Sequence, residues 1–283
     1  MSRRVSNIDD LIVPGLEKVP GTVSARLAAW RDARVEQAAD ESEVARLTPF
    51  ARPTEISITA IDIENPCAEY SEVTFKVGER TVVARLVMPR GICRPTGNVP
   101  CCLMFHDIDR PVRGWHHMTR FAASGFAVLA LDDEPVSADD LVDGISSPAF
   151  VERVQVGLAL AEVARSLDGV DPGRIFAWGE GFGGGIALAV AALDAPGLVC
   201  CALDNPLPAG VGALAPRVRG DVLLGTSLMD DISDPHDQIA LFNGLACDRR
   251  HIIYAKYAHE RINAFENEVL DFFNQTFYPC PKA

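Results

Sequence analysis

Two side chains of the types that exchange protons in catalysis each follow an apolar, strand-like run. Asp230 comes shortly after DVLLG (221–225), and His259 comes directly after HIIYAKY and one alanine (251–258). A histidine oriented by a carboxylate is the pair that activates nucleophiles in many hydrolytic enzymes. Taken singly, His259 could bond a backbone carbonyl and Asp230 could cap a helix. Their joint placement after two such runs leads us to expect that the pair is formed.

A third stretch, residues 174–193, supplies the turn on which a nucleophile would sit. It predicts a buried strand, a glycine-dense turn and a small-residue helix, the sequence of a nucleophile elbow with the pattern G-x-S-x-G. The flanking glycines are Gly179 and Gly183, but the apex residue is Gly181, which has no side chain. A frame with Glu180 at the apex is rejected, because bulky residues would then flank it in a turn that needs small ones.

The same glycines allow a second interpretation. Gly179, Gly181 and Gly184 spell G-x-G-x-x-G between a strand and a helix, and Asp204 ends the next apolar run about twenty residues on. This is the fingerprint of a dinucleotide-binding turn, in which the acid bonds the ribose. Such a fingerprint normally follows the first strand of its domain, whereas here at least two strand candidates precede it. Two interpretations of this turn therefore stay open: a nucleophile elbow, which needs no cofactor, and a dinucleotide-binding turn.

The elements that must position these residues alternate between strands and helices. Apolar runs at 99–105, 126–131, 174–178, 198–203, 221–225 and 251–257 predict strands. Helices are predicted at 115–124, 149–167, 236–245 and 261–277, and a small-residue helix is expected to follow the glycine turn at 179–185 and to run to about 193. This pattern predicts an α/β fold, with a mostly parallel central sheet covered by helices on both faces. A hairpin is expected at 72–77 and 81–88. Residues 1–55 should form an N-terminal arm and one helix through about 47, packed on a single domain at 56–283.

Composition excludes several classes of partner. The chain has 283 residues and a net charge of −13, which disfavours nucleic acid and anionic membranes. No apolar run is long enough to span a membrane, and the first residues lack a signal-peptide core, so we expect a cytoplasmic protein. The eight cysteines show no C-x-x-C spacing and are expected to be buried, reduced thiols.

No metal site is predicted. His116 and His117 are expected on a solvated helix face, and His106 is expected to have a structural role. The acidic cluster at 132–134 follows a strand, where a cation could be held, but a solvated acidic loop is the preferred interpretation.

The order of landmarks, elbow then acid then histidine, resembles that of the α/β-hydrolases. More narrowly, the chain resembles the acetylxylan esterase and cephalosporin C deacetylase family (carbohydrate esterase family seven). The resemblance covers most of residues 70–278. It rests on the predicted hairpin, VPCCLMFH, DGVDPGRI, the extra elbow glycine Gly184, LMDDISDP and YAHERINAFENEVLDFF. It implies that Asp230 is the triad acid, His259 the general base, and the backbone N–H groups of Ile108 and Phe182 the oxyanion hole. That family removes acetyl groups from sugars and cephalosporins, and its members associate.

The chain departs from this family at three places. Gly181 stands where the family has its nucleophilic serine, Asp107 stands where the oxyanion strand is followed by glycine, and only residues 205–220 occupy the position of a long helical insertion. As three separate changes at functional parts, they point to relaxed selection for catalysis. We expect a catalytically impaired scaffold or binder of a small acetylated or sugar-like ligand, with no cofactor; a homo-oligomer is left open. The alternative is a slow ester hydrolase in which Asp230 and His259 activate water.

Overall fold

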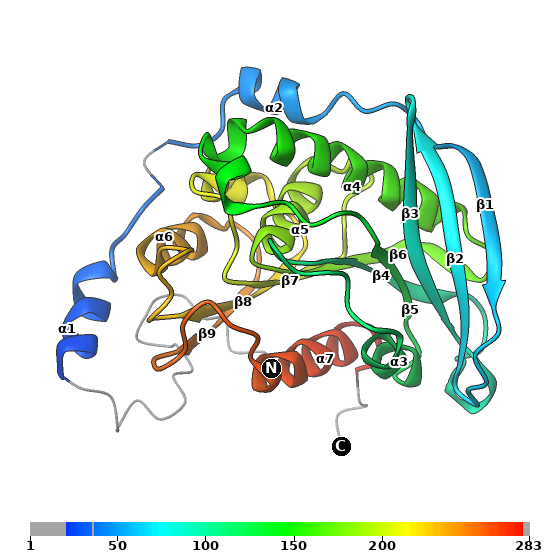
Figure 1. The fold of residues 1–283 in the computed structure, drawn as a ribbon. Coiled ribbons are helices and arrows are strands. Elements are labelled where there is room, and N and C mark those ends of the chain that lie inside the picture. Colours follow the sequence, from blue (N-terminus) through cyan, green and yellow to red (C-terminus); the bar gives the residue numbers. More distant parts are fainter. Residues whose placement is uncertain (1–20, 36, 280–283) are drawn as a thin grey trace.

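The computed structural model describes residues 21–35 and 37–279, which form one nine-stranded sheet with helices on both faces (Figure 1). The strands are β1 (Thr54–Ile61), β2 (Ala68–Val77), β3 (Arg80–Pro89), β4 (Val99–Phe105), β5 (Ala127–Leu131), β6 (Val170–Glu180), β7 (Cys200–Asp204), β8 (Asp221–Ser227) and β9 (Arg249–Tyr254). The helices are α1 (Gly21–Trp30), α2 (Glu41–Leu47), α3 (Trp115–Ala123), α4 (Pro148–Ser166), α5 (Phe182–Leu193), α6 (Pro235–Gly244) and α7 (Asn263–Phe277). The predicted arm at 1–20 lies outside the described residues.

The sheet is parallel where the candidate residues lie. Its strand order is β1-β2-β3-β5-β4-β6-β7-β8-β9; the β5-to-β9 part is parallel, and β1 to β3 join it antiparallel. Strands β4, β5 and β7 are buried along their whole length. Wholly apolar strands are what a sheet covered on both faces requires, so the predicted α/β architecture is confirmed.

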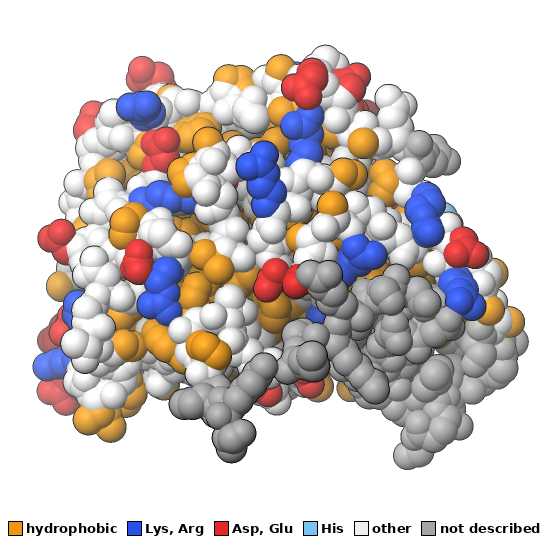
Figure 2. All heavy atoms as spheres, turned by 180° about the vertical axis from the view of Figure 1, so that it is seen from behind, with side chains coloured by type: hydrophobic (Ala, Val, Ile, Leu, Met, Phe, Trp, Pro, Cys, Tyr) orange, Lys and Arg blue, Asp and Glu red, His pale blue; other side chains and the backbone are white. Residues whose placement is uncertain are grey.

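Two apolar layers hold the sheet between the helices. One layer packs α4 and α5 against the sheet, and the other packs α3 and α7 against the opposite face (Figure 1). Figure 2, which looks from behind, shows Lys and Arg interspersed with acidic side chains rather than gathered in one area outside the grey atoms. No helix among the described residues is long and apolar enough to cross a membrane.

Three elements differ from those predicted from the sequence. The single helix expected through residue 47 is two helices, because the Asp40 side chain and Glu43 form a capping box that starts α2 afresh. The edge strand β1 was not predicted. Strand β6 begins at Val170, inside the segment expected to be a turn. The hairpin is confirmed as the antiparallel pair β2–β3. The proposed division at residues 55 and 56 stays a prediction.

The shortened segment at 205–220 carries a 3-10 helix, η6 (Val211–Arg217), with a cis peptide bond between Leu207 and Pro208. It packs on α5 and α6. This part of the chain is ordered against the core, although it is short.

Candidate active site

The apex of the turn between β6 and α5 is Gly181, as the sequence predicts. Its φ of 50° and ψ of −116° lie in a region that favours glycine, and it is the residue immediately before the helix. Its N–H donates to the carbonyl of Asp204 (2.7 Å), and its carbonyl accepts from the N–H of Leu207 (2.9 Å). The backbone of Gly181 is therefore held by the last residue of β7 and by the segment that follows β7.

The flanking glycines are required by close packing. A Cβ at Gly179 would overlap the backbone of Gly183, and a Cβ at Gly183 would overlap the carbonyls of Phe105 and His106. A Cβ at Gly184 would lie 3.2 Å from the carbonyl oxygen of Gly179. These glycines bring α5 close to the ends of β4 and β6.

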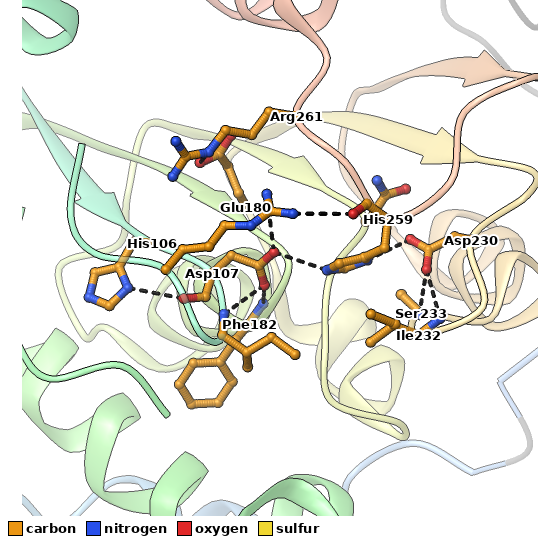
Figure 3. Close-up of polar contacts among 12 residues, drawn as sticks. His106, Asp107, Glu180, Phe182, Asp230, Ile232, Ser233, His259 and Arg261 are labelled. Atoms are coloured by element: carbon orange, nitrogen blue, oxygen red, sulfur yellow. Dashed lines mark hydrogen bonds and ion pairs between the residues drawn. The ribbon is translucent and has the colours of Figure 1, made fainter. Parts of the chain in front are cut away.

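The predicted acid–base pair is formed. Asp230 and His259 follow β8 and β9, and His259 Nδ1 lies 2.8 Å from Asp230 Oδ2 (Figure 3). The other carboxylate oxygen of Asp230 accepts from the N–H groups of Ile232 (2.9 Å) and Ser233 (2.8 Å). Because the loop itself binds this oxygen, the carboxylate is oriented toward the histidine.

Asp107, one of the three departures named above, lies at the centre of the site. It lies two residues after β4, its side chain is buried, and its carboxyl group fills the space beside Gly181. Figure 3 shows this carboxyl group turned toward His259 and Phe182. Its Oδ1 accepts from the N–H of Ile108 (2.8 Å) and from the N–H of Phe182 (3.0 Å). These are the two backbone donors predicted for an oxyanion hole, and a carboxylate of the chain occupies both.

The second oxygen of Asp107 completes a chain of three side chains. Asp107 Oδ2 lies 2.9 Å from His259 Nε2, so the imidazole is bonded on both nitrogens by carboxylates from Asp107 and Asp230. A Cβ on Gly181 would overlap the Asp107 carboxyl group. The Asp107 side chain therefore fills space that is free only because residue 181 is glycine.

Electrostatics lock this arrangement in its charged form. Burial by itself would lower the pKa of His259, but the hydrogen bonds to Asp107 and Asp230 and their negative charges raise it to about 10. Burial by itself would raise the pKa of Asp107, but the bond and charge of His259 and the two N–H groups lower it. At neutral pH the centre is thus an imidazolium between two carboxylates.

Little space remains around these groups. The cavity beside Asp107, Gly181 and His259 has a volume of about 10 Å³, room for about one water molecule, and its outer wall includes Arg110 and Arg261. Asp204 also lines it; burial and the charge of Glu180 raise the pKa of this carboxyl well above 3.8, which favours its neutral form. Its burial leaves it poorly placed to bond a ribose.

A second buried ionic cluster lies next to the elbow. Arg113 bonds Glu180, the residue before Gly181, and also Glu266 from α7 (2.7 Å). His117, expected on a solvated face, is instead buried against Trp178 and lies 3.0 Å from Glu266. Burial, followed by the charge of Arg113, lowers the pKa of His117 to about 3, so it is neutral. No pattern in the sequence pointed to this cluster.

The contacts of the other polar residues that the sequence analysis named, two histidines and the acidic cluster at 132–134, are as follows. His106 Nδ1 lies 3.1 Å from the carbonyl oxygen of Asp107, and His116 is exposed. Asp132 pairs with Arg85 (2.7 Å), and Asp133 pairs with Arg80 and Arg153. Asp132 and Asp133 are therefore neutralised by arginines, whereas Glu134 is exposed as expected for a solvated loop. Within residues 21–35 and 37–279 no group of three or more His, Cys, Asp or Glu side chains could hold a metal ion.

Comparisons with known proteins agree with this fold. A family model described as acetyl xylan esterase matches residues 149–202 and 210–276. The acetyl xylan esterase from Paenibacillus sp. R4 superposes with a TM-score of 0.73 and 18% identity, over 88% of this chain and 98% of that one. The chain has the α/β-hydrolase fold and resembles the acetyl xylan esterases. Acetyl xylan esterase 1 from Thermoanaerobacterium sp. JW/SL YS485 gives a TM-score of 0.68 and 18% identity, over 85% of this chain and 99% of that one.

One curated relative is similar over a shorter stretch. The quorum-quenching protein AidA of Acinetobacter baumannii (strain MDR-ZJ06) is 36% identical over 110 residues. That match covers 36% of this chain and 34% of AidA. The chain therefore matches about a third of this relative's length.

Proposed function

We propose that this chain is impaired as an acetyl-ester hydrolase and serves as a scaffold or small-ligand binder with an acetyl xylan esterase-like fold. The observation that carries the proposal is the position of the Asp107 carboxylate. Ester hydrolysis by a serine needs a hydroxyl at the elbow and two free N–H donors for the negative charge that develops on the carbonyl oxygen. Gly181 supplies no hydroxyl, and Asp107 takes both donors.

The pKa of His259 argues against the slow hydrolase that uses water directly. A general base must be unprotonated at the working pH, and the pKa of His259 is raised to about 10. Its Nε2 also faces Asp107 rather than open space. The pair of Asp230 and His259 is formed, but Asp107 holds it in the acid form.

Dinucleotide binding through Gly179, Gly181 and Gly184 has less support. The three glycines make close contacts with the chain itself, and the cavity that Gly181 lines, about 10 Å³, is too small for a pyrophosphate. Asp204, the residue expected to bond the ribose, is 4% exposed. We expect no thermal shift of the purified protein with NAD or NADP, and a saturable shift would revive this alternative.

The test is hydrolysis of p-nitrophenyl acetate by the parent and four variants, one of which is His259→Ala alone. The parent should be silent, and Gly181→Ser alone should stay silent, because the new Cβ overlaps the Asp107 carboxylate. Asp107→Gly with Gly181→Ser restores the hydroxyl, frees both N–H donors and releases His259. This double variant should exceed the parent by at least about 10²-fold. Adding His259→Ala to it should abolish the gain.

Two results would contradict the proposal. Parent activity that His259→Ala removes would show that the dyad works as it stands. Activity in Gly181→Ser equal to that of the double variant would show that Asp107 does not block the site. A double variant that is folded but inactive would place the defect in the shortened segment instead.

A second candidate function rests on the same contacts. Asp107 is ionised, and one of its oxygens already lies between two oxyanion-type donors. Its Oδ2 could attack a small alkyl carbon and expel an anionic leaving group, after which water would attack Cγ and release the alcohol. Alkylation would remove the charge that keeps His259 protonated. In a His259→Gln variant treated with a small epoxide, this function predicts a stable adduct on Asp107; the scaffold proposal predicts none.

A further inference from the structure

Cys67 and Cys93 lie together at one end of the β2–β3 hairpin. Of the seven described cysteines, four are buried in β4 and β7, and three are only partly buried, namely Cys67, Cys93 and Cys247. Burial raises the pKa of the four thiols in the strands far above the ordinary value, so they are unreactive. The partly buried thiols are the accessible ones.

The backbone groups of Cys67 and Cys93 both hydrogen-bond to the backbone of Arg90. Ala68 pairs with Pro89 across the hairpin, and one step further the N–H of Arg90 donates to the carbonyl of Cys67 (2.8 Å). A 3-10 turn, η3 (Gly91–Cys93), then folds back, and the N–H of Cys93 donates to the carbonyl of Arg90 (3.1 Å). Both cysteines are therefore held by hydrogen bonds to Arg90.

The side chains of the two cysteines also meet. A side-chain hydrogen bond with Cys67 is the largest influence on the Cys93 thiol and raises its pKa. Gly91 adopts a φ of +57°, and a Cβ there would lie 2.9 Å from the carbonyl oxygen of Pro66, so glycine permits the tight return of the chain. In Figure 1 the chain segments after β1 and after β3 come together at this end of the sheet.

We propose that Cys67 and Cys93 form an oxidisable dithiol that closes to an intramolecular disulfide on reaction with a low-molecular-weight disulfide such as oxidised glutathione. One cysteine thiolate attacks the glutathione disulfide, forms a mixed disulfide and releases one glutathione thiolate. The second cysteine thiolate then attacks the protein sulfur of the mixed disulfide and releases the other. The S–S bond of glutathione breaks, the Cys67–Cys93 bond forms, and two electrons pass to glutathione.

This disulfide would act on the hairpin rather than on the candidate active site. Strand β3 runs antiparallel to β5, and β5 runs parallel to β4. The end of β3 at Pro89 therefore lies near the strand starts of β4 and β5, whereas Asp107 follows the end of β4. The bond would tie the start of β2 to the turn after β3. It would stabilise the protein by restricting the unfolded chain, so the oxidised form should melt a few degrees above the reduced form.

The test uses the full chain, reduced, freed of reductant, incubated with oxidised glutathione and then alkylated. Trypsin cuts at Lys76, Arg80, Arg85 and Arg90 between the two cysteines, so the disulfide appears as two linked peptides. The parent and the matched control Cys247→Ser should both give this linked pair. Cys67→Ser and Cys93→Ser should each give only a glutathione adduct on the remaining cysteine and no rise in melting temperature on oxidation.

Either of two results would overturn the inference. In the first, Cys67 and Cys93 are recovered separately alkylated or separately glutathionylated in the parent. In the second, the linked peptides join one of them to Cys247. Ester hydrolysis does not enter this test, so its outcome is independent of the proposed function.

Discussion

At the scale of single residues, the geometry of the site depends on two residues, Asp107 and Gly181, that share one space. Asp107 and Gly181 are distant in sequence, and each looks like a separate loss when the chain is compared with the family it resembles. In the structure the carboxyl group of Asp107 lies in the space that a side chain at residue 181 would need. The two departures are therefore linked in space: the carboxylate of Asp107 occupies the place of the side chain that residue 181 lacks.

This coupling predicts a non-additive effect on stability. Gly181→Ser should lower the free energy of unfolding by about 1–3 kcal/mol, because its Cβ cannot fit beside the Asp107 carboxylate without displacing it. In an Asp107→Gly background the same replacement should cost less. Urea unfolding of the four proteins in the cycle measures the difference, and additive effects would show that the two side chains do not compete for space.

The positions of some site residues could be predicted from the sequence, but the direction and burial of other side chains could not. Asp230 and His259 were placed correctly, because each follows a strand that an apolar run marks. The direction of the Asp107 side chain could not be predicted, since it depends on a vacancy made by a residue 74 positions later. His117 was misplaced for a related reason: its burial is set by α7 and Trp178, which helix periodicity does not reveal.

At the scale of elements, glycines set the distance between the elbow helix and the strands beneath it. Most strands and helices of the parallel part were predicted within a few residues, because strands buried on both faces are wholly apolar and helices alternate with them. Edge strand β1 was missed although Ile56 and Ile58 alternate with Ser57 and Thr59 as in a strand; it is exposed at every position but the last, so its alternation marks no buried face. The N-terminal region was predicted as one helix rather than two because the Asp40 capping box was overlooked.

The close packing of α5 on the end of β4, where Gly183 contacts the backbone of Phe105 and His106, can be tested by substitution. Gly183→Ala should destabilise the fold by about 1–3 kcal/mol, because the added methyl group overlaps the backbone of Phe105 and His106 and cannot be relieved by a side-chain rotation. Gly173→Ala is the matched control, since its Cβ would meet only ordinary contact, 3.5 Å from Asp171 Oδ1. Thermal unfolding should separate the two variants, and equal melting temperatures would contradict this close packing.

At the scale of the whole molecule, the charged centre links stability to pH. The pKa of His259 is raised from 6.5 to about 10, so its contribution is fully present below pH 6.5 and is lost as pH rises toward 10. The pKa of Asp107 is lowered from 3.8, so its contribution is present above that pH and is lost in acid. The stability gained from the centre should therefore be greatest between about pH 4 and 6.5.

Comparison with His259→Asn isolates this contribution. The difference in free energy of unfolding between parent and variant should be on the order of a few kcal/mol at pH 6 and should shrink steadily between pH 7 and 10. Urea unfolding at a series of pH values gives the curve. A difference that stays constant across this range would mean that His259 is not held as an imidazolium in the folded state.

The most direct measurement of the central claim is the pKa of His259 by NMR titration of its imidazole, with Asp107→Asn as the comparison. The account predicts that the parent imidazole stays protonated at neutral pH and titrates near 10. In Asp107→Asn it should titrate at lower pH, because one of its two carboxylate partners has lost its charge. A parent imidazole that is neutral at pH 7, or a pKa that Asp107→Asn leaves unchanged, would contradict the claim that Asp107 closes this site.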